Sequence, residues 1–218
     1  MFKPGVFIAA LAFSYMFKPT WAANVDADKI VRQGNAKGAA ACAGCHGHNG
    51  AGQPAAGFPR LAGMNAEYLA KQLYDFKSGK RRNAIMQPIA KALSDGEVAA
   101  VTRYFADLPV PHAHDTTADP ALVRKGEQLA TAGDWGRNIP ACFQCHGAKG
   151  QGIGPHFPSI APQWSLYVRN QIRDWKNGSR HNDPISLMKS VAHRLTDDDV
   201  AAVAAFLAHG PIVPPGKQ

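Results

Sequence analysis

Apolar residues recur along this chain with the spacing of amphipathic helices, and the same spacing occurs twice. Four residues form the apolar face of one expected helix: Tyr68, Leu69, Leu73 and Phe76. A matching face follows 99 residues later, at Tyr167, Val168, Ile172 and Trp175. No stretch alternates apolar and polar residues convincingly at the period of a strand. The pattern therefore predicts an all-α fold.

Each half is also expected to end in a helix that begins with a capping box. Ser94 is followed three residues later by Glu97, and apolar positions continue at Val98, Val101, Phe105 and Leu108. In the second half, Thr196 and Asp199 precede Val200, Val203, Phe206 and Leu207. A short helix over residues 28–38 is expected to open the first half.

The first 22 residues have the pattern of a cleaved secretory signal. Lys3 precedes an uncharged stretch over residues 5–17, and Thr20 and Ala22 are small residues at positions −3 and −1 of a cleavage site after Ala22. A retained membrane anchor is the alternative, but 13 residues of helix span only about 20 Å of a hydrocarbon core about 30 Å thick. The sequence therefore predicts export to the periplasm, and leaves membrane association open.

The mature chain reads as a tandem duplication. The segment Phe-Pro-Arg-Leu-Ala at 58–62 returns as Phe-Pro-Ser-Ile-Ala at 157–161. The same offset of 99 relates Tyr68, Gln72, Gly79 and Arg81 to Tyr167, Gln171, Gly178 and Arg180. A stretch rich in Pro, Asp and Thr lies between the copies. We expect one domain over residues 23–108, a linker over 109–120 and a second domain over 121–218.

All four cysteines belong to two C-x-x-C-H pentapeptides, which are attachment motifs for c-type haem. Cys42 and Cys45 precede His46, and Cys142 and Cys145 precede His146. In this motif each thiol adds to a haem vinyl group, and the histidine binds the iron. A zinc site or a thioredoxin-like thiol pair would leave the histidine after both pairs unexplained. The motifs predict two covalently bound haem c groups.

Two methionines are candidates for the second axial position of each iron. Met86 stands seven residues before Leu93, and Met188 seven residues before Leu195, so each half has a methionine at the same position before its last helix. A lone methionine is usually core filling, but matched positions in two haem-bearing repeats favour a ligand. Met64 is matched by Gln163 and is expected to pack in the core. The other histidines have no counterpart in the opposite half and are expected at the surface: His48, His112, His114, His156, His181, His193 and His209.

With these motifs, the chain resembles the exported dihaem class I cytochromes of the c-four type, over essentially the whole mature sequence. The resemblance implies two tandem cytochrome c-like domains that each wrap around one haem, with His46 and Met86 on one iron and His146 and Met188 on the other. It also implies that the carbonyls of Pro59 and Pro158 accept a hydrogen bond from the axial histidine. The alternative for each proline is that it only ends a turn.

The expected function is one-electron transfer from a respiratory donor to a terminal oxidase or reductase, with redox proteins of membrane respiratory complexes as partners and no stable small-molecule substrate. One alternative is a cytochrome subunit of a dehydrogenase or oxidase complex. Another is an enzyme, either a dihaem peroxidase or a thiosulfate-oxidising cytochrome, which would need a labile or unusual axial position. Methionine at both irons argues against an enzyme.

The net charge of +8 at first suggests a nucleic-acid binder. Removal of the signal leaves 22 basic and 16 acidic residues, and four haem propionates would offset much of the remaining charge. The tightest basic cluster, Lys80-Arg81-Arg82, is expected to be a solvated loop, with docking to an acidic redox partner as a weaker alternative. The charge therefore indicates a mildly basic electron carrier and no nucleic-acid partner.

Overall fold

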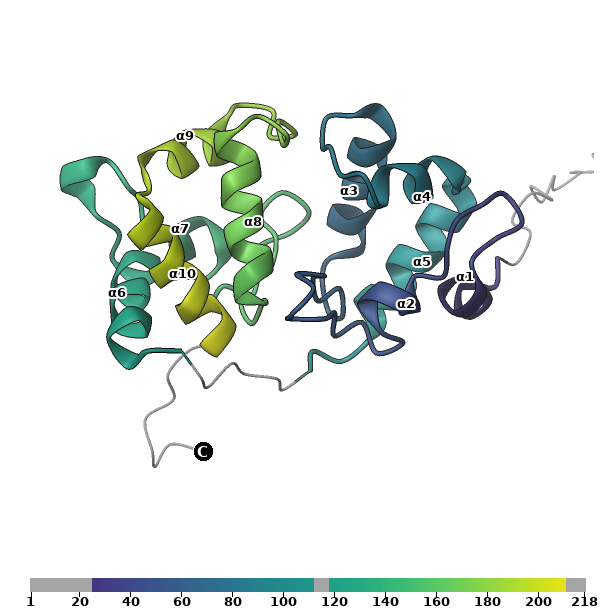
Figure 1. Ribbon diagram of the computed structural model, residues 1–218, viewed down its shortest axis with the longest axis horizontal. Helices are drawn as coiled ribbons and strands as arrows, with labels where there is room; N and C mark the ends of the chain where they lie inside the picture. The colour runs from purple at the N-terminus through teal and green to yellow at the C-terminus, as the bar shows by residue number, and fades with distance from the viewer. Residues whose placement is uncertain (1–24, 112–117, 211–218) are drawn as a thin grey trace, which may run out of the picture.

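The computed structural model describes residues 25–111 and 118–210. The expected signal segment, 1–22, lies outside the described residues, as does the middle of the expected linker. Two helical halves lie side by side, and the described part of the chain contains isolated β-bridges but no strand (Figure 1). The all-α prediction is confirmed. No helix in this part of the chain is long and apolar enough to span a bilayer.

The two halves repeat one order of helices. The first contains α1 (Ala27–Gln33), α2 (Ala43–His46), α3 (Ala66–Ser78), α4 (Met86–Ala92) and α5 (Asp95–Asp107). The second contains α6 (Pro120–Thr131), the 3₁₀ turn η1 (Trp135–Arg137), α7 (Cys142–His146), α8 (Ser165–Lys176), α9 (Leu187–Arg194) and α10 (Asp197–His209). The first and last helices pack together in each half, α1 on α5 and α6 on α10.

Both predicted capping boxes are present. Ser94 accepts from the backbone N–H of Glu97 while the Glu97 carboxylate accepts from the N–H of Ser94. Thr196 and Asp199 make the same reciprocal pair at the start of α10. These bonds satisfy backbone donors that the first turn of a helix leaves unpaired. They fix the residue at which the last helix of each half begins.

The expected helix over residues 28–38 is shorter than the sequence pattern suggested. It ends at Gln33 because Gly34 adopts a φ of 76°, and a Cβ there would lie 2.0 Å from the Ala39 carbonyl oxygen.

The corresponding glycine of the second half has a different role. Gly126 lies inside α6, where a Cβ would come within 2.0 Å of the Ala202 carbonyl oxygen of α10. Gly126 therefore permits the close crossing of α6 and α10 that Figure 1 shows.

The second half carries an extra loop, residues 133–140, which an aspartate ties to the core. Asp199 is 2% exposed and lies 2.7 Å from Arg137 Nη1 and 3.3 Å from Lys125 Nζ. Burial alone would raise the pKa of Asp199. The hydrogen bonds from Arg137 and Thr196 outweigh burial and hold that pKa below its usual range. The ionised carboxylate thus links the loop, α6 and α10.

Replacing Gly126 by Ala should destabilise the protein by about 1–3 kcal/mol, because the new methyl group overpacks the α6–α10 crossing. Chemical denaturation of the haem-loaded protein would measure the change. Gly96→Ala in α5 is the matched control: its Cβ would meet only Val25 at 3.6 Å, and alanine favours a helix. Equal stability of the two variants would contradict a tight crossing.

Asp199→Asn should lower the stability of the protein near neutral pH. A carboxylate whose folded pKa is depressed contributes stability above its unfolded pKa of about 3.9, and that contribution is lost as the pH falls through the folded pKa. The difference between wild type and variant should therefore shrink on acidification below about pH 4. Denaturation curves across pH would show it, and a difference independent of pH would contradict the ionised carboxylate.

Candidate haem-binding sites

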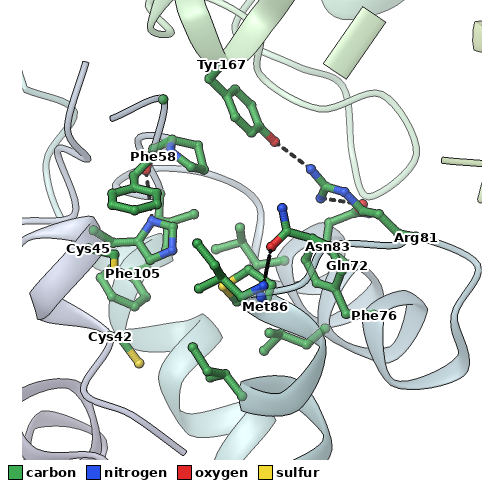
Figure 2. Close-up of a pocket in the computed structure, with 18 of the residues that line it drawn as sticks. Cys42, Cys45, Phe58, Gln72, Phe76, Arg81, Asn83, Met86, Phe105 and Tyr167 are labelled. Carbon is green, nitrogen blue, oxygen red and sulfur yellow. Dashed lines mark hydrogen bonds between the residues drawn. The ribbon is translucent and has the colours of Figure 1, made fainter. Parts of the chain in front are cut away.

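The first half contains a cavity of about 450 Å³, within the size range of ligand and cofactor sites. Cys42, Cys45 and His46 line it, together with apolar side chains of α3, α4 and α5. Figure 2 shows the two cysteines at the left of the view and Met86 with Asn83 near its centre. The cavity is therefore open to the attachment motif at one wall and to the methionine at another.

A single helical turn places the three residues of the first motif. The backbone N–H groups of Cys45 and His46 both bond to the Cys42 carbonyl, at 3.2 and 2.9 Å. This turn places both cysteines in the wall of the cavity. Burial raises the pKa of the Cys42 thiol, and it raises the pKa of Cys142 to about 11. A thioredoxin-like pair needs a thiol of lowered pKa, so that alternative does not fit.

Each motif histidine is buried and holds one defined hydrogen bond. His46 Nδ1 lies 3.0 Å from the Pro59 carbonyl oxygen, and His146 Nδ1 lies 2.8 Å from that of Pro158. Because a carbonyl only accepts, Nδ1 carries the proton and Nε2 keeps its lone pair. Burial lowers the pKa of both imidazoles, and the carbonyl bonds oppose this only in part. Neutral imidazole with a free Nε2 is the form that binds iron.

The donor set of each site therefore suits a covalent haem. Two thiols for the vinyl groups and one neutral imidazole come from a single turn. Among the described residues, no three His, Cys, Asp or Glu side chains gather as they would around a zinc ion. Cys142 and Met188 pack against the core cluster of the second half, as Cys42 does in the first.

The two methionines lie at matching places at the start of a helix. Met86 is the first residue of α4, where its backbone N–H donates to Asn83 Oδ1 at 2.9 Å. Met188 is the second residue of α9. Both side chains are half-buried. Met64, by contrast, is 7% exposed and belongs to the core cluster of the first half, as expected. Axial ligation by Met86 and Met188 stays a prediction.

The halves meet through two arginines that exchange partners. Arg81 donates to Tyr167 of the second half at 2.9 Å (Figure 2), and Arg180 donates to Tyr68 of the first at 3.1 Å. Their guanidinium groups lie over aromatic rings of their own halves, at 4.6 Å from the Phe76 centroid and 4.5 Å from that of Trp175. Arg81 and Tyr167 both line the cavity, so the second half completes a wall of the first site.

The expectation of a solvated loop at Lys80-Arg81-Arg82 is wrong for Arg81, which is 7% exposed. The backbone there pairs with the equivalent segment of the other half: Arg82 N donates to Ser179 O at 2.8 Å, and His181 N donates to Lys80 O at 3.0 Å. The repeat had already matched Arg81 with Arg180 and Tyr68 with Tyr167. Matching the two halves in sequence does not show that each arginine bonds the tyrosine of the other half.

The remaining histidines lie mostly where the sequence placed them. Within the described residues, four are exposed and one is half-buried: His48, His156, His181, His193 and, half-buried, His209. His112 and His114 lie outside the described residues.

The cytochrome c family model matches the chain twice, over residues 31–109 and 123–211. The chain belongs to the cytochrome c family. Its two tandem cytochrome c domains each carry a C-x-x-C-H motif, and the cysteine pairs Cys42/Cys45 and Cys142/Cys145 hold two covalent haem c groups.

Sequence relatives of this cytochrome include thiosulfate dehydrogenase electron acceptors and cytochromes c4. A "thiosulfate dehydrogenase electron acceptor" of Stutzerimonas stutzeri (strain A1501) is 48% identical over 185 residues, which is 84% of this chain and 86% of the relative. A second protein of that name, from Thiomonas intermedia (strain K12), is 46% identical over 81% of each chain. A cytochrome c4 of Pseudomonas aeruginosa is 39% identical over 80% of this chain and 85% of the relative.

Solved structures agree with the tandem arrangement. Reduced cytochrome c4 from Pseudomonas stutzeri matches 78% of this chain and 93% of its own length, with a TM-score of 0.72 and 32% identity. Thiosulfate dehydrogenase from Marichromatium purpuratum matches 85% of this chain with a TM-score of 0.79 and 40% identity. The cytochrome spans about two fifths of that longer chain, 40% of its length. Together these matches make the protein a dihaem electron carrier.

Proposed function

We propose that this cytochrome works in the periplasm, accepts electrons from a thiosulfate-oxidising haem enzyme and passes them to a respiratory acceptor such as a terminal oxidase or reductase. The observation that carries the proposal is the identity of 48% and 46% with two proteins named as electron acceptors of thiosulfate dehydrogenase, against 39% with a cytochrome c4. The solved thiosulfate dehydrogenase whose chain contains a similar tandem unit supports a functional association with such an enzyme.

An electron carrier needs a donor set that changes little between oxidation states. We propose His46 and Met86 as axial ligands in the first half and His146 and Met188 in the second, which supply one-electron iron chemistry when haem is bound. The chain's own contribution is positional. The Pro59 and Pro158 carbonyls orient the imidazoles, and Asn83 holds the backbone at Met86.

The contact between the halves around Arg81–Tyr167 and Arg180–Tyr68, the seam, favours passage of electrons from one site to the other. The first cavity is lined by residues of both halves, including Arg81 and, from α8, Tyr167 and Gln171. The reciprocal arginine bonds hold this wall without an ion pair: in the described part of the chain, no salt bridge involves either Arg81 or Arg180. The hydrogen bonds from the two charged guanidinium groups join the halves, which favours a fixed relative position of the two sites while electrons enter and leave.

Stopped-flow reduction of the oxidised cytochrome by a thiosulfate dehydrogenase and thiosulfate would test the donor. We expect both haems to be reduced, with a second-order rate constant of about 10⁵–10⁷ M⁻¹s⁻¹, typical of specific protein docking. Omitting the enzyme is the control. Reduction by thiosulfate alone would assign the oxidation to this chain itself, and reduction no faster than that of an unrelated monohaem cytochrome c would remove the proposed donor.

Met86→Ala and Met188→Ala should each open one axial position. Carbon monoxide should then bind one haem per reduced chain, whereas the wild type binds none readily, and the near-infrared Met-to-iron absorption should fall by half. Met64→Leu is the matched control, because Met64 packs in the core and the substitution conserves volume. Ready binding of carbon monoxide to both haems of the wild type would contradict the methionine ligands.

A further inference from the structure

The peptide group that holds the first axial histidine is also bonded from the other half of the molecule. The Pro59 carbonyl accepts from His46 Nδ1 at 3.0 Å, and the Arg60 N–H donates to Gln163 Oε1 at 3.0 Å. That carbonyl and that N–H belong to one planar peptide unit. Gln163 of the second half is thus linked to His46 of the first through a continuous chain of two hydrogen bonds and one peptide.

Gln163 is held in place from several directions. It is 4% exposed, and its backbone N–H donates to the Leu207 carbonyl at the end of α10. Its Nε2 donates to the Arg60 carbonyl at 3.1 Å, while its Oε1 accepts from the Arg60 and Trp164 N–H groups, both at 3.0 Å. Two donors at the oxygen and an acceptor at the nitrogen define the orientation of the amide.

The Arg60 side chain fastens the same contact. Its guanidinium donates to the Pro162 carbonyl at 2.7 Å and to Ser159 Oγ at 2.9 Å, both in the second half. It lies among carbonyl and hydroxyl oxygens, and burial lowers the pKa of Arg60 to about 10. These bonds from the Arg60 side chain help to hold the Pro59–Arg60 peptide next to Gln163.

The arrangement has no mirror image in the tandem repeat. The peptide that holds His146 is Pro158–Ser159, and none of the hydrogen bonds between described residues uses the Ser159 N–H. The residue that corresponds to Gln163 in the first half is Met64, which lies in the core and offers no amide oxygen. Between the described residues of the two halves, therefore, it is the first site alone whose histidine-holding peptide has an acceptor from the neighbouring half.

We propose that Gln163 is a positioning residue that acts through the Pro59–Arg60 peptide to lower the reduction potential of the first haem. An acceptor on the N–H of a peptide polarises its carbonyl, which strengthens the bond that this carbonyl accepts. A stronger acceptor at His46 Nδ1 makes the imidazole a more basic ligand. A more basic ligand stabilises the more positive Fe(III) state, and the potential falls. The inference rests on His46 as an iron ligand, as proposed above.

Two substitutions at Gln163 should move the potential in opposite directions. Gln163→Met, which copies the residue of the first repeat, removes the acceptor and should raise the potential of the first haem. Gln163→Glu keeps an acceptor and adds charge, since the neighbouring Arg60 guanidinium favours an ionised carboxylate, and should lower it. Both lose the bond from Nε2 to Arg60, so the difference between them reports the acceptor together with the charge that glutamate adds to it.

The measurement is a redox titration of the haem-loaded full chain in which NMR of the haem methyl signals monitors each haem separately. The first haem is identified by its contacts to cavity residues such as Phe105. We expect about a threefold change in the Fe(III)/Fe(II) equilibrium constant of the first haem for each variant, with the second haem shifting less. At about 59 mV per tenfold for one electron, this is about 28 mV.

Trp164→Phe is the matched control, because it removes another bond across the same seam, from Trp164 Nε1 to the Ala51 carbonyl at 2.6 Å, without touching the Pro59–Arg60 peptide. Shifts of the same sign in both Gln163 variants, or equal shifts at both haems, would assign Gln163 a packing role and overturn the proposal. Shifts no larger than that of Trp164→Phe would overturn it as well. Absence of the axial-histidine signature from the wild-type spectrum would instead refute His46 as an iron ligand, on which the inference rests.

Discussion

The hydrogen bond between each motif histidine and a proline carbonyl is the interaction on which the rest of the structure depends. It forces the proton onto Nδ1 and leaves Nε2 of His46 and His146 free to bind iron. It also joins the C-x-x-C-H turn to the loop after it, and in the first half the two cysteines and the histidine line one cavity. A domain of fewer than one hundred residues buries little apolar surface on its own, and a haem in that cavity completes its core.

Much of this architecture could be predicted from the sequence because it depends on local spacing. The capping boxes at Ser94 and Thr196, the apolar faces of α3 and α8 and the two attachment turns are all decided within a few residues. The early end of α1 was missed because Gly34 stops the helix through its contact with Ala39, a turn whose geometry an apolar period does not contain. The short helices that begin near Met86 and Met188 have too few residues to show a period.

The contacts between the halves were out of reach for a different reason. The sequence repeat identified Arg81 and Arg180 as equivalent residues, and Tyr68 and Tyr167 likewise. Because the halves meet almost symmetrically, each arginine donates a hydrogen bond to the tyrosine of the other half. A basic run such as Lys80-Arg81-Arg82 usually lies in solvent. It is buried at Arg81 because tyrosine and glutamine oxygens from both halves accept its donors, which offsets the loss of water.

The two sites have different surroundings because some residues differ between the two repeats. A carrier with identical halves would have identical surroundings at both irons, and nothing in the protein would favour one position for the electron. Where the first half has Arg60 and Met64, the second has Ser159 and Gln163, and this pair of exchanges produces a one-way contact from the second half to the first. Because the contact ends on the peptide that orients His46, a change of two residues at the seam reaches the proposed iron ligand without altering the motif or the fold.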